Sequence, residues 1–206
     1  MILSAPPSPR RRASKVSWEM KYRTIIADPP WPYAQPLGRG KKAGVVARGG
    51  LPYSAMTIQS IAQMPIQRLA DDDCQLWLWT TNSHIHEALH VIDAWGFTYK
   101  TMATWAKTQI GLGYWLRGQT EHCILAIKGH PRAKLTGPNG ATGNAWSTLI
   151  TAPRSDHSTK PQAFYDMAEN IGESPRLELF ARRLRLGWDA WGDEAKTIEL
   201  PKDEAQ

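Results

Sequence analysis

Apolar residues gather along this chain in short blocks, and the spacing within each block predicts a strand or a helix. Near-continuous apolar runs bounded by turn signals are typical of buried strands. This pattern is clearest in residues 74–80, and residues 22–27 also read as a buried strand; residues 98–107, 121–128 and 176–181 are predicted as three further strands. The sequence therefore predicts strands along nearly its whole length.

Helical spacing of apolar positions appears between these strands. A helix over residues 57–69 begins at Thr57, a favoured N-cap, and is interrupted at Pro65, which has no N–H to donate inside a helix. A late helix is predicted over residues 160–171, after a stretch rich in glycine, proline and asparagine at residues 137–144.

A helix over residues 83–95 carries a pattern that imitates a metal site. It ends before Gly96, a residue that suits the turn after a helix. His86 and His90 have the spacing of zinc proteases. On a helical wheel, however, they point away from the apolar stripe, which consists of Ile85, Ala88, Leu89, Ile92 and Trp95. We therefore expect both histidines to face solvent and to hold no metal.

Strands that alternate with helices indicate an α/β fold. This order favours a Rossmann-like, mostly parallel sheet with helices on both faces. The chain of 206 residues fits one domain, which we place at residues 21–196. Residues 1–20, rich in proline, serine and arginine, predict a flexible basic tail, with a transit peptide as the alternative. Residues 197–206 are expected to form a short C-terminal tail.

The segment Asp28-Pro29-Pro30-Trp31 comes directly after the first predicted strand, where parallel sheets bind ligands. The two prolines fix φ and remove backbone donors, so the Asp28 carboxylate and the Pro29 carbonyl can accept hydrogen bonds from one amino group. Trp31 offers a flat face for stacking. Such acceptors draw a conjugated amine toward a nucleophilic geometry, which predicts methyl transfer to an amino group. The alternative is a proline-terminated strand whose aspartate caps a turn.

The second half of the predicted site comes late in the chain. Residues 158–161, 176–182 and 187–194 supply an ammonium, a guanidinium and several acids among apolar side chains. S-adenosylmethionine needs a cation for its carboxylate, acids for its amine and ribose, and apolar contacts for its adenine. A glycine-rich phosphate turn is missing from the sequence, as suits a cofactor without a pyrophosphate.

Charge and cysteine content bear on the partners and the compartment. The chain has 25 Lys and Arg against 19 Asp and Glu, a net charge of +6, which favours a polyanion such as nucleic acid. Cys74 and Cys123 each lie in an apolar run and predict buried, reduced thiols. No run has the length of a membrane span, so we expect a cytoplasmic protein without membrane attachment.

Short matches in a fixed order give the chain a family resemblance from Tyr22 to about Glu194. It resembles the family of the eukaryotic messenger-RNA adenosine-N6 methyltransferase catalytic subunit and its bacterial and phage relatives. The segments that carry the resemblance are residues 27–31, 51–53, 76–80, 105–108, 121–123, 158–161, 178–182 and 187–194. It implies a Rossmann-like, S-adenosylmethionine-dependent N6-adenine methyltransferase in which the catalytic motif precedes the cofactor segments.

The resemblance also implies roles for single residues. Asp28, Pro29, Pro30 and Trp31 are the catalytic set, and Asp28 also helps to orient the cofactor amine. The cofactor-binding set is Asp28, Lys160, Glu178, Phe180, Arg182, Asp193 and Glu194. We assign the substrate, including the phosphates and edges of its bases, to Tyr33, Tyr53, Lys107, Arg117 and Glu121, together with Arg39, Lys41 and Lys42. The assignments of Arg117 and Lys107 follow from their positions beside a predicted loop, and an ordinary surface side chain is the alternative for each.

The substrate and the alternatives follow from the same residues. A target adenine must be flipped out of a duplex or met single-stranded. DNA is slightly preferred to RNA, because the sequence suggests a compact single domain with no separate RNA-binding module. By analogy with the family, this size also fits a bacterial or phage origin. The sequence is compatible with either a homodimer or a heterodimer. Two features depart from the family: the acids Asp193 and Glu194 stand where an amide is common, and a basic, glycine-rich loop fills residues 32–50. The loop is expected to grip substrate, with a merely solvated loop as the alternative. Rival functions are methylation of cytosine N4 or a glutamine amide, and a catalytically silent nucleic-acid-binding scaffold.

Overall fold

Seven strands form one sheet in the computed structural model, which describes residues 20–32, 55–112, 115–133, 146–154 and 159–201. The strands are β1 (Tyr22–Ala27), β2 (Ala70–Thr80), β3 (Thr98–Lys107), β4 (Thr120–Lys128), β5 (Leu149–Ala152), β6 (Arg176–Leu179) and β7 (Asp189–Trp191). The helices are α1 (Ile58–Ala62), α2 (Ile66–Leu69), the short 3₁₀ helix η1 (Asn82–His84), α3 (Ile85–Ala94) and α4 (Gln162–Ile171).

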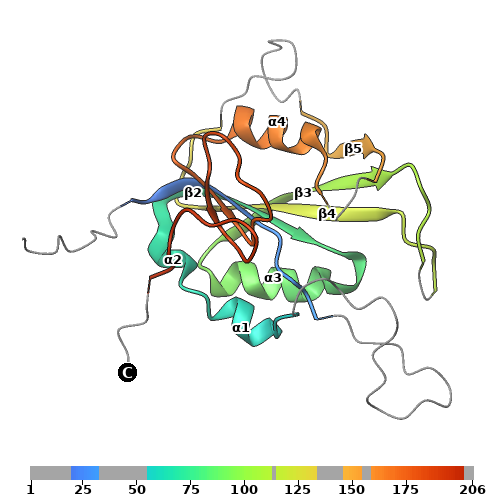
Figure 1. The fold of residues 1–206 in the computed structure, drawn as a ribbon, viewed down its shortest axis with the longest axis horizontal. Coiled ribbons are helices and arrows are strands. Elements are labelled where there is room, and N and C mark those ends of the chain that lie inside the picture. Colours follow the sequence, from blue (N-terminus) through green and yellow to red (C-terminus); the bar gives the residue numbers. More distant parts are fainter. Residues whose placement is uncertain (1–19, 33–54, 113–114, 134–145, 155–158, 202–206) are drawn as a thin grey trace, which may run out of the picture.

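The sheet has the order β5-β3-β4-β2-β1-β6-β7 and is mostly parallel. Only β4 runs against its neighbours, β2 and β3. Helix α4 covers one face of the sheet, and α1, α2 and α3 lie on the other (Figure 1). This arrangement confirms the α/β, Rossmann-like prediction.

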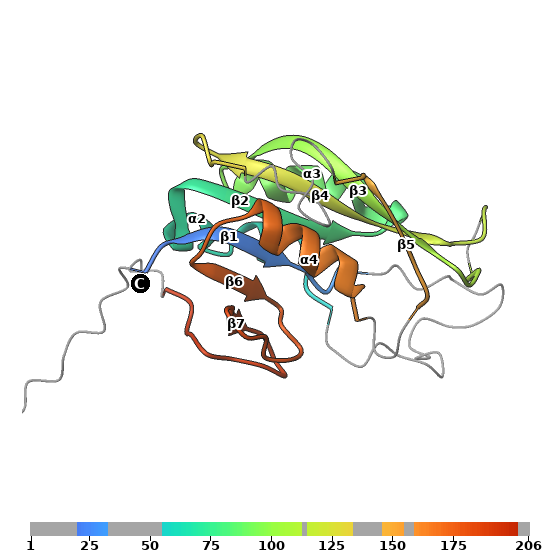
Figure 2. The same cartoon turned by 90° about the horizontal axis from the view of Figure 1, so that it is seen from above.

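Strand β1 occupies the middle of the parallel part, between β2 and β6 (Figure 2). Its register places Ala27 beside Leu78 of β2 and Leu179 of β6. All residues of β1 except Arg23 are buried, because helices cover both sides of the sheet, as in other parallel sheets. The residues after Ala27 therefore emerge at the carboxyl edge, between two neighbouring strands.

Two apolar clusters fill the space between the sheet and its helices. The first joins α1, α2 and α3 to the sheet around Ile61, Ile92 and Trp95. The second lies under α4 and is largely aromatic; it includes Trp77, Trp79, Trp105, Phe164, Tyr165 and Trp188. Burying one such side chain contributes roughly 1.5–3 kcal/mol. Cys74 and Cys123 are both free and buried, as predicted.

The helices confirm the predicted break at Pro65, but the buried face of α3 differs from the predicted one. The segment 57–69 divides into α1 and α2 around Pro65, as the missing N–H requires. In α3 the buried positions are Ala88, Val91 and Ile92, whereas Leu89 is 36% exposed. The stripe is thus rotated from the predicted one, farther from His86 and His90, which are exposed.

Two edge strands and part of the C-terminal segment differ from the sequence predictions. β5 and β7 were not predicted, because each is short and lies at an edge of the sheet. Residues expected in a C-terminal tail are packed instead: Ile198 and Leu200 contact the first cluster, and the Thr197 N–H donates to the Ala190 carbonyl. The packed chain therefore continues beyond residue 196. Residues 1–19 and 137–144 lie outside the described part.

The described helices include none that is both long and apolar enough to cross a membrane.

Candidate active site

The turn after β1 is held by backbone hydrogen bonds. The Trp31 N–H donates to the Pro29 carbonyl (2.9 Å), and the Met56 N–H donates to the Pro30 carbonyl (3.0 Å). Two prolines in succession suit this turn because neither has an N–H that would be left unpaired. The Pro29 carbonyl, expected to accept from a target amine, already accepts inside the turn, so one lone pair remains for a ligand.

Trp31 lies inside the protein and does not form an exposed stacking face. Its side chain is 3% exposed, and its indole N–H donates to the Trp79 carbonyl (2.9 Å). The ring stacks on His84, with centroids 5.8 Å apart and planes 20° from parallel, and His84 Nε2 lies 2.9 Å from the Pro32 carbonyl. The prediction that Trp31 stacks on a base is therefore wrong for this conformation; the indole instead anchors the turn.

A row of alternating charges connects the turn to the rest of the sheet. Asp28 Oδ2 lies 2.9 Å from Lys160 Nζ, and Lys160 Nζ lies 3.0 Å from Glu121 Oε2. The other Glu121 oxygen pairs with Lys107. We call Asp28, Lys160, Glu121 and Lys107 the ion chain. Its members come from the turn after β1, the segment before α4, β4 and β3, so it crosses the carboxyl edge of the sheet.

Burial sets the electrostatics of the ion chain. The Lys160 side chain is 8% exposed. Burial alone would lower its pKa, but the Asp28 and Glu121 carboxylates raise the pKa of Lys160 above its ordinary value. Burial likewise opposes ionisation of Glu121, yet the charges of Lys160 and Lys107 hold the pKa of Glu121 below its ordinary value. Removing one member of such a chain leaves an uncompensated buried charge, at a cost of about 3–5 kcal/mol.

Aromatic rings lie against both cations of the ion chain. Lys160 Nζ is 4.9 Å from the centre of the Trp79 ring, and Lys107 Nζ is 4.9 Å from that of Trp105. A cation over an indole face is attracted by the ring quadrupole. The aromatic cluster under α4 therefore also holds the charged groups of the site in place.

Glu178 lies on β6 and is paired with Tyr165 of α4. The Tyr165 hydroxyl donates to Glu178 Oε1 (2.8 Å), and the Arg185 guanidinium sits 3.5 Å from the centre of the Tyr165 ring. Burial raises the pKa of Glu178, and the Tyr165 hydrogen bond and the Arg185 charge offset this only in part. The sequence predicted that Glu178 orients nearby basic groups. In the structure its carboxylate also accepts a hydrogen bond from Tyr165, a contact that the sequence did not indicate.

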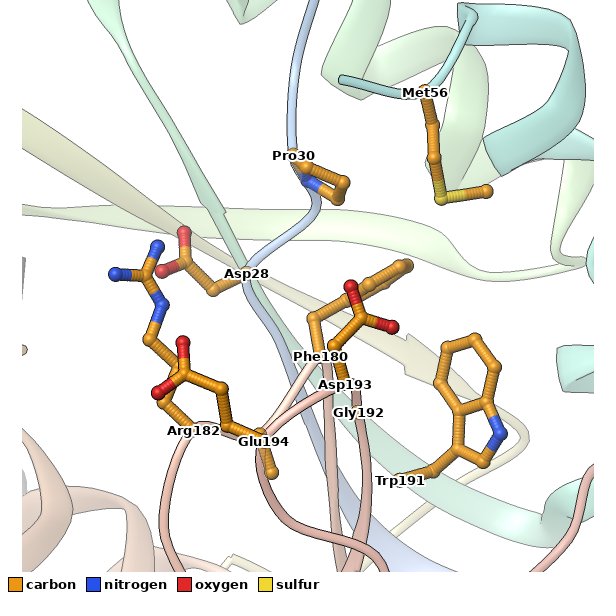
Figure 3. A pocket seen from close by; sticks show the side chains of 10 residues that line it. Asp28, Pro30, Met56, Phe180, Arg182, Trp191, Gly192, Asp193 and Glu194 are labelled. Atoms are coloured by element: carbon orange, nitrogen blue, oxygen red, sulfur yellow. The ribbon is translucent and has the colours of Figure 1, made fainter. Parts of the chain in front are cut away.

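A pocket of about 210 Å³ opens beside the turn. Asp28 and Arg182 lie on one side of it in Figure 3, Met56 and Trp191 on the other, and Phe180 and Asp193 between them. The full lining is Asp28, Pro30, Met56, Phe180, Ala181, Arg182, Trp191, Gly192, Asp193 and Glu194. Asp28 thus belongs to both the pocket and the ion chain. Lys160 does not line the pocket but contacts Asp28, which does.

The backbone around the pocket is shaped by two unusual residues. Phe180 has a φ of 61°, rare for a residue with a side chain, and its ring meets Trp191 edge to face at 5.6 Å. A Cβ on Gly192 would lie 2.2 Å from the Ala181 carbonyl oxygen, so only glycine allows the two segments to approach this closely. Together they line part of the pocket with the aromatic rings of Phe180 and Trp191.

The structure brings together most of the predicted cofactor residues. Asp28, Phe180, Arg182, Asp193 and Glu194 line the pocket, and Lys160 adjoins it. Among the predicted substrate residues, Lys107 and Glu121 pair with each other. Arg117 lies in the loop between β3 and β4. The remaining substrate residues lie outside the described part: Tyr33, Tyr53, Arg39, Lys41 and Lys42.

Sequence reasoning missed the roles of Trp79, Tyr165, Met56 and Trp191. Trp79 and Tyr165 read only as apolar positions of a strand and a helix. Met56 comes directly before Thr57, the N-cap of α1. Its position next to a predicted helix start was the one signal in the sequence that could have pointed to Met56.

Among the described residues, no group of three or more His, Cys, Asp or Glu side chains is placed to hold a metal ion. The exposed pair His86 and His90 therefore has no third ligand within that part of the chain.

The chain is similar in sequence to known methyltransferases. The family model MT-A70 matches residues 22–194. The type II methyltransferase M.MunI of a Mycoplasma species is 31% identical over 196 residues, which cover 88% of this chain and 82% of that protein. The human N(6)-adenosine-methyltransferase catalytic subunit METTL3 is 27% identical over 87% of this chain and 29% of its own length. A probable rice N(6)-adenosine-methyltransferase, MT-A70-like, is also 27% identical, over 24% of its length. The chain thus spans most of the Mycoplasma protein and about a quarter of the two eukaryotic ones.

Proposed function

Because the chain belongs to the MT-A70 family, we propose that it transfers a methyl group from S-adenosylmethionine to the N6 amine of adenine in nucleic acid. One observation carries this proposal: Asp28 stands at the carboxyl end of the central strand, where the ion chain meets the pocket. A carboxylate in that position can touch two bound molecules, one in the pocket and one beside the turn.

The pocket suits the cofactor in its chemistry. Arg182 offers a guanidinium, Asp193 and Glu194 offer acceptors for hydroxyl and amino groups, and Phe180 and Trp191 offer an apolar wall for a purine ring. The absence of an amide at positions 193 and 194 does not remove acceptors, since carboxylates accept hydrogen bonds as well. When bound, S-adenosylmethionine supplies an electrophilic methyl group.

The residues of the turn prepare the amine. Asp28 accepts a hydrogen bond from the amino group while Lys160 fixes the carboxylate through its 2.9 Å contact. Withdrawing an N–H hydrogen toward Asp28 concentrates the lone pair on nitrogen, which is otherwise spread into the ring. Lys160 itself is fixed by Glu121 and the Trp79 ring, so little reorganisation is needed when charge develops. As the new carbon–nitrogen bond forms, the bond between the methyl carbon and the cofactor sulfur breaks and leaves a neutral thioether, and the surplus proton leaves nitrogen for Asp28 or water.

The substrate is a base that has left its stack, because a paired adenine presents no accessible amine. DNA is the polymer we propose first, because the chain covers 82% of the type II methyltransferase M.MunI but 29% of METTL3, whose name specifies adenosine, the ribonucleoside. The net charge of +6 supports a polyanionic partner of either kind.

The test is methyl transfer from isotope-labelled S-adenosylmethionine to separate pools of single-stranded DNA, duplex DNA and RNA, followed by digestion and mass spectrometry of the nucleosides. N6-methyladenine in at least one pool is expected. The Asp28→Asn variant keeps the shape of the side chain and should lose about 100-fold or more in rate, the range for removing one key electrostatic contact. A His86→Ala variant, which alters an exposed residue, is the matched control and should retain full activity.

Two results would contradict this function. Methylated cytosine N4 or a methylated protein amide, without N6-methyladenine, would assign the site to another amine. Failure of the purified protein to bind S-adenosylmethionine would favour a silent scaffold.

A further inference from the structure

The loop between β3 and β4 exposes large apolar side chains that nothing in the described chain covers. Ile110 is 56% exposed, Leu112 92%, Trp115 98% and Leu116 85%. We call these residues the apolar tip. Single exposed apolar residues are common on protein surfaces, but several in one loop indicate an interaction site.

The neck of this loop is fixed by hydrogen bonds. The Gly111 N–H donates to the Gly118 carbonyl (2.7 Å), and the Gly118 N–H donates to the Leu112 carbonyl (3.1 Å). The Arg117 Nε–H donates to the Gly111 carbonyl (2.6 Å). A Cβ on Gly111 would lie 2.9 Å from the Gly118 oxygen, so the close approach of the two sides needs glycine. The neck therefore presents Leu112, Trp115 and Leu116 of the apolar tip outward instead of letting them fold back onto the core.

The apolar tip belongs to the same edge of the sheet as the catalytic turn. Its loop leaves β3 at Lys107 and enters β4 just before Glu121, and both residues are members of the ion chain that ends at Asp28. The Lys107 N–H donates to the Gln119 carbonyl (2.8 Å), which closes the base of the loop. Both ribbon views show this connection reaching past the body of the sheet (Figures 1 and 2). Ile110 lies at most about 10 Å along the chain from Lys107.

The charge around the apolar tip is positive. Residues 108–119 contain no Asp or Glu and include Arg117. The Arg154 N–H donates to Gln109 Oε1 (3.0 Å), which brings a second arginine to the base of the loop. A second copy of this chain would bring the same positive charge to the contact. A polyanion with apolar, flat groups complements the surface better, and unpaired nucleic-acid bases on their phosphate backbone have that chemistry.

We propose that the apolar tip stacks on nucleic-acid bases beside the target adenine, with Trp115 as the main stacking group. This inference rests on the proposed function for the identity of the polymer. Apolar and aromatic side chains that enter a base step unstack it, and extrusion of a base needs such unstacking. The apolar tip thus replaces the buried Trp31 as the exposed aromatic surface of the site, while Asp28 keeps the chemistry.

The test measures binding and methyl transfer separately. Fluorescence anisotropy with a labelled, adenine-containing single strand reports affinity, and a duplex with 2-aminopurine next to the target adenine reports unstacking through a rise in emission. Trp115→Ala should bind the single strand about 5- to 150-fold more weakly, the range for removing one stacked aromatic, and should abolish the rise in emission. Trp115→Phe should restore most of both signals. The matched control is Tyr99→Ala, an aromatic residue 48% exposed near the amino end of β3, which should change neither.

The possible outcomes separate this proposal from the proposed function. If Trp115→Ala binds and unstacks like the wild type while the wild type methylates adenine, the role of the apolar tip is overturned and the enzymatic function stands. If the wild type binds and unstacks nucleic acid through Trp115 but methylates nothing, the function fails and the role of the tip stands. Loss of a dimer in Trp115→Ala, measured by light scattering, with unchanged nucleic-acid affinity per chain, would make the apolar tip a protein interface and overturn the proposal. Absence of any nucleic-acid binding by the wild type would overturn it as well.

Discussion

Trp79 contacts both halves of the candidate site through different parts of one residue. Its carbonyl accepts from the Trp31 indole, and its ring lies under Lys160. The backbone of β2 thus sets the position of the catalytic turn, while a side chain of the same residue sets the position of the cation. A shift of β2 would move both together, which keeps their relative geometry constant.

Replacing Trp31 tests its role as an anchor. Trp31→Phe keeps a ring against His84 but removes the N–H, so the buried Trp79 carbonyl loses a donor. We expect the free energy of unfolding to fall by about 1–3 kcal/mol, the cost of leaving a buried polar group unpaired. Urea denaturation measures this change. Unchanged stability together with weaker binding of a free adenine base would instead return Trp31 to the role of stacking partner.

The ion chain predicts a dependence of stability on pH. The pKa of Glu121 is lower in the folded protein than its ordinary value of 4.5, so its contribution is present above that value and is lost as the pH falls through the folded pKa. The pKa of Lys160 is raised, so its contribution is present below its ordinary value of 10.5 and is lost as the pH rises through the folded pKa.

Unfolding free energies of the wild type and of Glu121→Gln at several pH values test the acid limb. Glu121→Gln should be less stable at neutral pH, and the difference should shrink as the pH falls below 4.5, because the wild-type carboxyl is then also neutral. A difference that stayed constant from neutral pH to about pH 3 would mean that the Glu121 charge does not stabilise the fold.

At the scale of elements, the segment after β7 approaches the segment after β6 so closely that only glycine fits. A Cβ on Gly192 would meet the Ala181 oxygen at 2.2 Å and the Ala181 nitrogen at 2.5 Å. Gly192→Ala should therefore force the two segments apart and cost about 3 kcal/mol or more, as substitutions that create severe overlap do. S-adenosylmethionine affinity should fall with it.

Calorimetric binding of S-adenosylmethionine and thermal unfolding check this prediction. Gly187→Ala is the matched control, because a Cβ there meets nothing within 4 Å, although its φ of +80° still brings some strain. Equal effects of the two substitutions would show that backbone strain, and not overlap at Gly192, determines the loss.

Local sequence patterns predicted the central elements better than the edges. The bounds of β1 and β3 match their predicted ranges, because turn residues mark their ends: Pro29 and Pro30 follow β1, and Gly96 precedes β3. β5 and β7 have four and three residues and no periodicity to detect. The burial of Trp31 depends on His84 and Trp79, which are distant in the sequence. The ion pairs of Lys160 with Asp28 and Glu121 also join residues that are distant in the sequence. The sequence singled out all three residues but could not show that they pair.

At the scale of the whole molecule, the net charge of +6 predicts that nucleic-acid binding weakens with salt. If three basic side chains contact phosphates of a single strand, the affinity should fall about 20-fold between roughly 50 and 200 mM salt. A salt titration followed by anisotropy gives the slope. A binding constant independent of salt would exclude phosphate contacts and leave base stacking as the source of affinity.

The position of β1 bears on how the chain becomes active during its synthesis. β1 is made first, yet its neighbour β6 lies about 150 residues later, and the pocket needs residues up to Glu194. Contacts between such distant segments form slowly and only after both have left the ribosome. A shortened translation product that ends before β6 would contain Asp28 and Trp31 but no pocket beside them. Premature termination before β6 should therefore yield fragments that bind no cofactor and transfer no methyl group.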